Sequence, residues 1–177
     1  LEYTAAAGGA AFVVGQQNLV AKLTNSYSVA SDTPDFWRRP GEAYPQHAGR
    51  FTGEPAYFYH VKTSTKALLA EAELKPSDID FCVFHTPNAK FPRKVTKMLG
   101  FTQEQLVPSL VVEKVGNTYA GASMLALAAV LDQAQANQKI LVTSYGSGAG
   151  ADSFLFETTN LLEKNKKNWT DFVLDQI

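Results

Sequence analysis

Five short segments of the chain have the pattern of β-strands. Each is rich in β-branched, aromatic or small apolar residues and is bounded by glycine, asparagine or proline, which interrupt regular structure. The segments are residues 10–14, 21–28, 81–85, 139–145 and 153–158. The first is apolar without alternation, which is typical of a strand buried on both faces.

Helical periodicity appears between these strands. Residues 57–72 place apolar side chains on one helix face, and residues 91–99 form a second predicted helix that Gly100 is positioned to cap. Residues 120–137 are rich in alanine and leucine and nearly uncharged, which predicts a helix buried on all sides. Strands that alternate with helices indicate a layered α/β domain.

Residues 31–53 have neither periodicity. Their prolines and glycines predict irregular structure, and an ordered loop of this length is usually functional. The alternative is an insertion that packs through Phe36, Trp37 and Tyr44. Both interpretations are kept.

Composition and charge narrow the function classes. Hydrophobic residues make up 45% of the chain and charged residues 19%, which is typical of a globular domain with a core. The formal net charge of -1 provides no overall field for nucleic acid or an anionic membrane. No apolar run approaches the roughly 20 residues of a membrane span. The single cysteine, Cys82, excludes an internal disulfide and fits a reducing compartment, so we expect a cytoplasmic protein.

The two ends of the sequence suggest its organisation. There is no initiator methionine, and the chain opens directly into the apolar run that leads to residues 10–14. Because such a strand needs neighbours, we expect the chain to be a piece of a larger protein or one partner of a split enzyme. We expect one domain over residues 1–160, with an inserted loop at 31–53, and a tail at 161–177.

Two polar residues lie where strands and helices meet. His85 ends a predicted buried strand, which is where α/β sheets bind ligands. Asn117 follows Gly116 and opens the apolar helix. Each has a structural alternative, namely a hydrogen-bonded core histidine and a helix N-cap.

A glycine-rich stretch and a basic helix add to the candidate site. Residues 145–152 connect two predicted strands and form either a hairpin or a loop that contacts a ligand through its backbone. No Lys-Ser/Thr pair follows, so this is not a P-loop. Lys90, Lys94 and Lys97 share one helix face, which is either a solvated surface or a phosphate contact.

The order of these features is specific. A strand followed by His85-Thr86-Pro87-Asn88, then Gly116-Asn117-Thr118, then a strand, a glycine-rich loop and a strand resembles the C-terminal half of thiolase-superfamily condensing enzymes. These include β-ketoacyl synthase III, chalcone synthase-like enzymes and hydroxymethylglutaryl-CoA synthase. Four segments are similar to the archaeal type of the last family, namely DFWRR (35–39), RFTGEPAYF (50–58), HTPNAKFP (85–92) and SYGSG (144–148).

The resemblance implies a thiolase-like fold, with this chain as the C-terminal half of a layered α/β enzyme with a mixed five-stranded sheet. It implies an acyltransferase of the mevalonate pathway that condenses acetyl-CoA with acetoacetyl-CoA, with coenzyme A thioesters as substrates and neither a cofactor nor a metal. The family's nucleophilic cysteine lies in the N-terminal half. Cys82 cannot replace it, because a thiol inside an apolar strand stays neutral.

The family's site residues carry over to matching positions. His85 and Asn117 are expected to be catalytic, donating hydrogen bonds to substrate oxygens on which negative charge develops. The expected substrate-binding residues are Tyr145, Gly146, Ser147, Pro87, Lys90 and Lys94.

The resemblance also implies partners. These are the N-terminal half of the enzyme, further copies of the assembled unit, and acetoacetyl-CoA thiolase joined through a small zinc-ribbon/OB-fold protein. Two other functions stay open, a β-ketoacyl synthase III-like acyltransferase and a non-catalytic scaffold half. The segments around Trp37 and Phe51 argue against the first, and the presence of His85 and Asn117 argues against the second.

Overall fold

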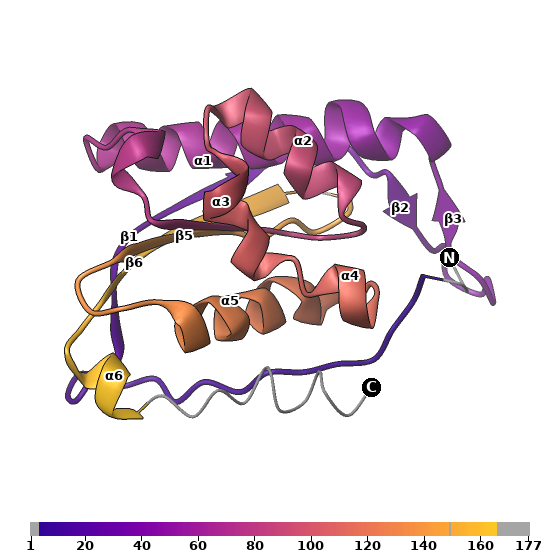
Figure 1. Cartoon of the computed structure of the whole chain (residues 1–177). Helices are drawn as coiled ribbons and strands as arrows, with labels where there is room; N and C mark the ends of the chain where they lie inside the picture. Colours follow the sequence, from indigo (N-terminus) through magenta and orange to yellow (C-terminus); the bar gives the residue numbers. More distant parts are fainter. Residues whose placement is uncertain (1–3, 149, 166–177) are drawn as a thin grey trace.

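A computed structural model describes residues 4–148 and 150–165 and shows helices packed on both faces of a central sheet (Figure 1). The strands of this sheet are β1 (Ala21–Ala30), β4 (Phe81–Phe84), β5 (Lys139–Thr143) and β6 (Gly150–Thr158). Their order is β1-β6-β5-β4, with β4 and β5 parallel and the other neighbours antiparallel. The prediction of a layered α/β domain with a mixed sheet is therefore confirmed.

Long helices cover the two faces. Figure 1 shows α1 (Phe58–Glu71) and α2 (Lys90–Leu99) on one side of the sheet and α5 (Ala122–Gln133) on the other. The core divides in the same way, because side chains alternate along a strand. Cys82 and Phe84 pack in the α1 cluster, whereas Val83 packs in the α5 cluster. The described residues also contain three shorter α-helices, namely α3 (Gln103–Leu106), α4 (Val112–Val115) and α6 (Leu161–Asn165).

One helix boundary follows a local sequence signal, and another is set by tertiary packing. Gly100 ends α2 with a φ of 84°, a left-handed conformation that glycine adopts without strain, as predicted. The third predicted helix is shorter than residues 120–137, because α5 ends at Gln133. Ala134 is extended and fully buried there, so tertiary packing overrides its helix propensity and turns the chain toward β5.

The prediction of five strands is wrong for the described residues, where the main sheet has four. Residues 10–14 form no strand, and the side chains of Val13 and Val14 are fully exposed. An apolar strand needs a neighbouring strand for its backbone hydrogen bonds, and the described part of the chain supplies none to this segment. Nearby, Ala5 forms an isolated parallel bridge with Asn117.

Residues 31–53 are more regular than predicted. They contain a two-stranded hairpin of β2 (Phe36–Trp37) and β3 (Gln46–His47). Phe36 and Trp37 are half-buried, whereas Tyr44 is 82% exposed and contributes little packing.

The last described residues pack onto the domain. Leu162 of α6 is buried in the α5 cluster, and the rest of the expected tail, residues 166–177, lies outside the described residues. None of the described helices is both long and apolar enough to cross a membrane.

Candidate active site

His85 lies directly after β4, where the strand leaves the sheet. Its backbone N–H donates to the Thr143 carbonyl at 2.9 Å, and its ring lies 6.1 Å from the ring of Tyr145. Within the described residues, neither imidazole nitrogen of His85 takes part in a hydrogen bond. The imidazole is therefore held by its backbone and by packing, and both nitrogens are left for a ligand.

Burial lowers the pKa of His85 from 6.5 to about 4, because the charged imidazolium loses hydration there. At neutral pH the ring is uncharged, so one nitrogen donates a hydrogen bond and the other accepts one. A neutral imidazole can donate to a developing oxyanion while its second nitrogen stays free to accept a proton.

This pKa predicts how stability depends on pH. Between pH 4 and pH 6.5 the unfolded chain binds the proton at position 85 and the folded chain does not. The contribution of His85 is therefore complete above pH 6.5 and is lost as the pH falls through about 4, up to about 3 kcal/mol of unfolding free energy. Denaturant unfolding of the wild type and of His85→Gln across this range measures it. Parallel profiles for the two proteins would contradict the prediction.

Asn117 is buried between α4 and α5. Gly116 precedes it with a φ of 95°, where a Cβ atom would come within 3.0 Å of the Thr4 carbonyl oxygen. The Asn117 backbone accepts from the Ala6 N–H at 2.8 Å and donates to the Thr4 carbonyl at 2.7 Å. The N-terminal segment thus holds Asn117 like a short strand.

One of the two polar groups of the Asn117 side chain is already hydrogen-bonded. Its Oδ1 accepts from the Tyr119 N–H at 2.8 Å, in a local turn that opens α5. The Nδ2 group has no acceptor within the described ranges, so it is oriented but available as a donor. The helix-start interpretation of Asn117 is therefore compatible with a ligand contact by the same side chain.

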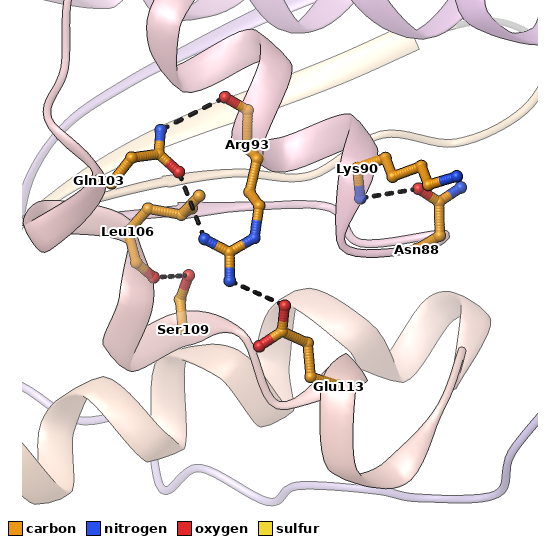
Figure 2. Close-up of polar contacts among 7 residues, drawn as sticks. All are labelled: Asn88, Lys90, Arg93, Gln103, Leu106, Ser109 and Glu113. Carbon is orange, nitrogen blue, oxygen red and sulfur yellow. Dashed lines mark hydrogen bonds and ion pairs between the residues drawn. The ribbon is translucent and has the colours of Figure 1, made fainter.

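A polar clamp, formed by Arg93, Gln103 and Glu113, connects α2, which follows His85, to α4, which precedes Asn117 (Figure 2). Arg93 of α2 donates to Glu113 of α4 at 2.8 Å and to Gln103 of α3 at 3.4 Å. The Gln103 amide returns a bond to the Arg93 carbonyl at 3.4 Å. Asn88 accepts from the backbone N–H of Lys90 at 3.0 Å, which caps the start of α2. The clamp links the two candidate catalytic regions through side chains.

The glycine-rich turn after β5 is held by a buried carboxylate. Asp35, only 1% exposed, accepts from the Tyr145 hydroxyl at 3.0 Å, the Gly148 N–H at 2.9 Å and the Ser147 hydroxyl at 3.3 Å. Burial and the Asp35 carboxylate raise the pKa of Tyr145, so its phenol stays protonated as a donor. The Gly146 N–H is used within the turn, where it donates to the Gly150 carbonyl at 2.9 Å. The hydroxyls of Tyr145 and Ser147 are therefore committed to Asp35.

The remaining predicted site residues lie at the same end of the molecule. Figure 1 shows that β5 ends, and α2 and α5 begin, toward one end of the fold, and β4 runs parallel to β5 and ends beside it at Phe84. Pro87 is half-buried in the turn before α2, and Lys90 and Lys94 are exposed. Lys94 lies 4.5 Å over the ring of Phe58, which occupies its ammonium group in a cation–π contact. Neither lysine belongs to the two ion pairs found within the described ranges.

Cys82 is fully buried in the strand that leads to His85. Burial raises the pKa of its thiol to about 12, so it is protonated at neutral pH and packs as an apolar group. Across residues 4–148 and 150–165, no three His, Cys, Asp or Glu side chains are grouped as a metal site.

Sequence reasoning missed two residues next to the site, Asp35 and Tyr57. Asp35 stands in the DFWRR segment but is distant in sequence from the turn that it holds. The Tyr57 hydroxyl donates to the His85 carbonyl at 2.7 Å. Neither residue has a local signal, because each partner is brought near only by the fold.

Comparison with known proteins places this chain in a family. Residues 69–158, which include His85, Asn117 and Tyr145, match the family described as 3-Oxoacyl-[acyl-carrier-protein (ACP)] synthase III C terminal. The hydroxymethylglutaryl-CoA synthase of Methanopyrus kandleri is 57% identical over 164 residues, which cover 93% of this chain and 47% of that protein. The chain spans about half the length of the curated relatives that it matches.

Solved structures of known enzymes have the same fold as this chain. A hydroxymethylglutaryl-CoA synthase complexed with CoA superposes with a TM-score of 0.73 at 23% identity, covering 88% of this chain and 44% of that one. The 3-oxoacyl-[acyl-carrier-protein] synthase III of Aquifex aeolicus gives 0.70 at 18% identity, covering 80% and 46%. The thiolase-like fold is thereby confirmed. The chain belongs to the 3-oxoacyl-[acyl-carrier-protein] synthase III C-terminal family and is a homologue of the archaeal hydroxymethylglutaryl-CoA synthases.

Proposed function

We propose that this sequence is the C-terminal part of an archaeal-type hydroxymethylglutaryl-CoA synthase of the mevalonate pathway. The whole enzyme condenses acetyl-CoA with acetoacetyl-CoA to 3-hydroxy-3-methylglutaryl-CoA, with coenzyme A thioesters as substrates and no cofactor or metal. The observation that carries the proposal is the 57% identity to the Methanopyrus kandleri synthase over 93% of this chain.

The proposed condensation requires hydrogen-bond donors at the carbonyl oxygens of the substrates. An acetyl group carried on a cysteine of the other half loses a methyl proton, and the resulting carbanion attacks the ketone of acetoacetyl-CoA. Water then releases the product. Negative charge develops on oxygen at each stage, and fixed neutral donors stabilise it. In this proposal His85 and Asn117 supply those donors, supported by the unpaired imidazole and by the uncommitted Asn117 Nδ2 group.

The other contacts to acetoacetyl-CoA are proposed from the hydrogen-bond donors and charged groups that have no partner within the described residues. In the turn of Tyr145, Gly146 and Ser147, the backbone N–H of Ser147 has no partner within residues 4–148 and 150–165, so it is the donor available to a thioester oxygen. Lys90 is exposed and adjoins the turn that contains His85 and Pro87, so it is the better of the two lysines for a CoA phosphate. Lys94 is the weaker choice because it already contacts Phe58.

The proposal includes partners. The N-terminal half would cover the side of α5 on which Met124, Ala128 and Leu131 are only half-buried. A homo-oligomer of the assembled unit, and docking to acetoacetyl-CoA thiolase through a zinc-ribbon/OB-fold protein at residues 31–53, are proposed from the resemblance. A cytoplasmic location is proposed because the single cysteine is a free, buried thiol.

The test is a product assay. The full-length enzyme that contains this sequence is incubated with acetyl-CoA and acetoacetyl-CoA, and 3-hydroxy-3-methylglutaryl-CoA is detected by mass spectrometry. We expect this product from the full-length enzyme and none from the 177-residue chain alone. Product formed by the chain without any partner would contradict the proposed role of a nucleophile on the other half.

The same assay separates the alternatives. The match to the synthase III family favours, as a second candidate, a β-ketoacyl synthase III-like acyltransferase that uses different acyl groups. A β-ketoacyl product from other acyl thioesters, with no reaction of acetoacetyl-CoA, would support this candidate. Binding of CoA without either product would indicate a scaffold half.

A further inference from the structure

The backbone of His85 is held at two points of different kinds. Its N–H continues the β4–β5 ladder by donating to the Thr143 carbonyl at 2.9 Å. The next bond of a ladder would use the His85 carbonyl, but the strand pairing ends at Phe84 and Thr143. The Tyr57 hydroxyl donates to this carbonyl at 2.7 Å instead. A side chain thus takes the place of a missing sheet bond at the residue that carries the candidate catalytic imidazole.

Tyr57 is itself tightly fixed. It stands just before α1 and is 1% exposed. Its ring lies 5.2 Å from that of Phe58, 5.1 Å from Phe91 at the start of α2, and 5.5 Å from Tyr145 in the turn after β5. A hydroxyl carried on a ring packed from three elements has little freedom, so the carbonyl that it binds has little freedom too.

The contacts also reach the imidazole. The Tyr145 ring packs against both Tyr57 and His85, at 5.5 and 6.1 Å. Burial raises the pKa of Tyr57 well above its usual value, so the phenol keeps its proton and stays a donor at every working pH. No other hydrogen bond within the described ranges sets the direction of the His85 side chain, which therefore depends on its backbone and on these rings.

We propose that Tyr57 is a positioning residue for His85: its buried hydroxyl fixes the His85 carbonyl and so aims the imidazole at the substrate oxygen. The proposal rests on the function proposed above. Tyr57 touches no substrate in this role and acts only through His85.

The test removes one oxygen atom, the hydroxyl oxygen of Tyr57. Tyr57→Phe keeps the ring and removes the hydroxyl, and Tyr59→Phe is the matched control, because Tyr59 is a neighbouring tyrosine that is 49% exposed. Both variants are made in the full-length enzyme. We expect Tyr57→Phe to lower kcat for condensation by about 10- to 100-fold, as a misaligned catalytic group does, with little change in KM for acetoacetyl-CoA. Acetyl transfer to the enzyme's nucleophile and the kinetics of Tyr59→Phe should stay close to wild type.

A second readout does not depend on activity. The imidazole resonances of His85, assigned with His85→Gln, should shift in Tyr57→Phe and not in Tyr59→Phe. Unchanged resonances and unchanged kcat in Tyr57→Phe would overturn the proposal, as would an equal loss of acetyl transfer and condensation, which indicates general damage. If the wild type forms no product, the proposed function fails, and the resonances still decide whether Tyr57 positions His85.

Discussion

Replacing His85 with alanine in the full-length enzyme is expected to slow condensation by about 10²–10³-fold, the usual cost of losing one oxyanion donor. The reason is geometric and electrostatic. The imidazole is held at the end of β4, is neutral because its pKa is about 4, and has no internal partner to release before it binds an oxygen. Acetylation of the nucleophile should persist. Rapid-quench measurement of the acetyl-enzyme and of the product, in single turnovers, separates the two steps.

Two variants sharpen this test. His85→Gln keeps a neutral donor of similar reach and should retain more condensation than His85→Ala. His47→Ala removes an exposed imidazole from the β2–β3 hairpin and should behave as wild type. A His85→Ala enzyme that fails to be acetylated yet condenses a preformed acetyl-enzyme normally would show that the assigned role is wrong.

Asp35→Ala is expected to lower the free energy of unfolding by about 2–4 kcal/mol, because it leaves the buried Tyr145 hydroxyl and the half-buried Gly148 N–H without their acceptor. The exposed Ser147 hydroxyl can bond to water and adds little. The turn should also loosen, which would weaken binding of acetoacetyl-CoA. Denaturant unfolding measures the first effect, and calorimetric titration with acetoacetyl-CoA measures the second.

Asp32→Ala is the matched control, since this carboxylate lies three residues earlier and is exposed. Its stability should change by less than about 0.5 kcal/mol, as for most surface substitutions. Asp35→Asn can keep its Oδ1 as the acceptor for Tyr145 and Gly148 and turn its amide N–H toward the Ser147 hydroxyl, which can accept, so we expect a smaller loss. Equal stability of Asp35→Ala and Asp32→Ala would contradict the role given to the buried carboxylate.

Some elements could be predicted because their signal is local. The apolar run before His85 became β4, the periodic segment 57–72 became α1, and Gly100 ended α2 with a positive φ. In each case the residues that determine the element lie within it or next to it. Their hydrophobic periodicity already matches the element, and burial of the apolar face stabilises it.

Other features depended on neighbours that sequence spacing does not reveal. Residues 10–14 are as apolar as a strand but lack a paired edge within the described residues, so the predicted five-stranded sheet has four strands. The predicted helix over residues 120–137 ended at Gln133, because Ala134 is drawn into the core. The irregular segment 31–53 formed a hairpin whose Asp35 is buried under the glycine-rich turn.

The sequence by itself determined the layered α/β class and the family, because these rest on periodicity and on motifs read along the chain. It also indicated His85 and Asn117 as candidate site residues. Only the tertiary structure decided that Asp35 holds the turn after β5, that Arg93 joins α2 to α4, and that the Tyr57 hydroxyl bonds to the backbone carbonyl of His85. These pairs are 110, 20 and 28 residues apart. A hydrogen bond depends on distance and angle, and only folding brings such distant donors and acceptors together.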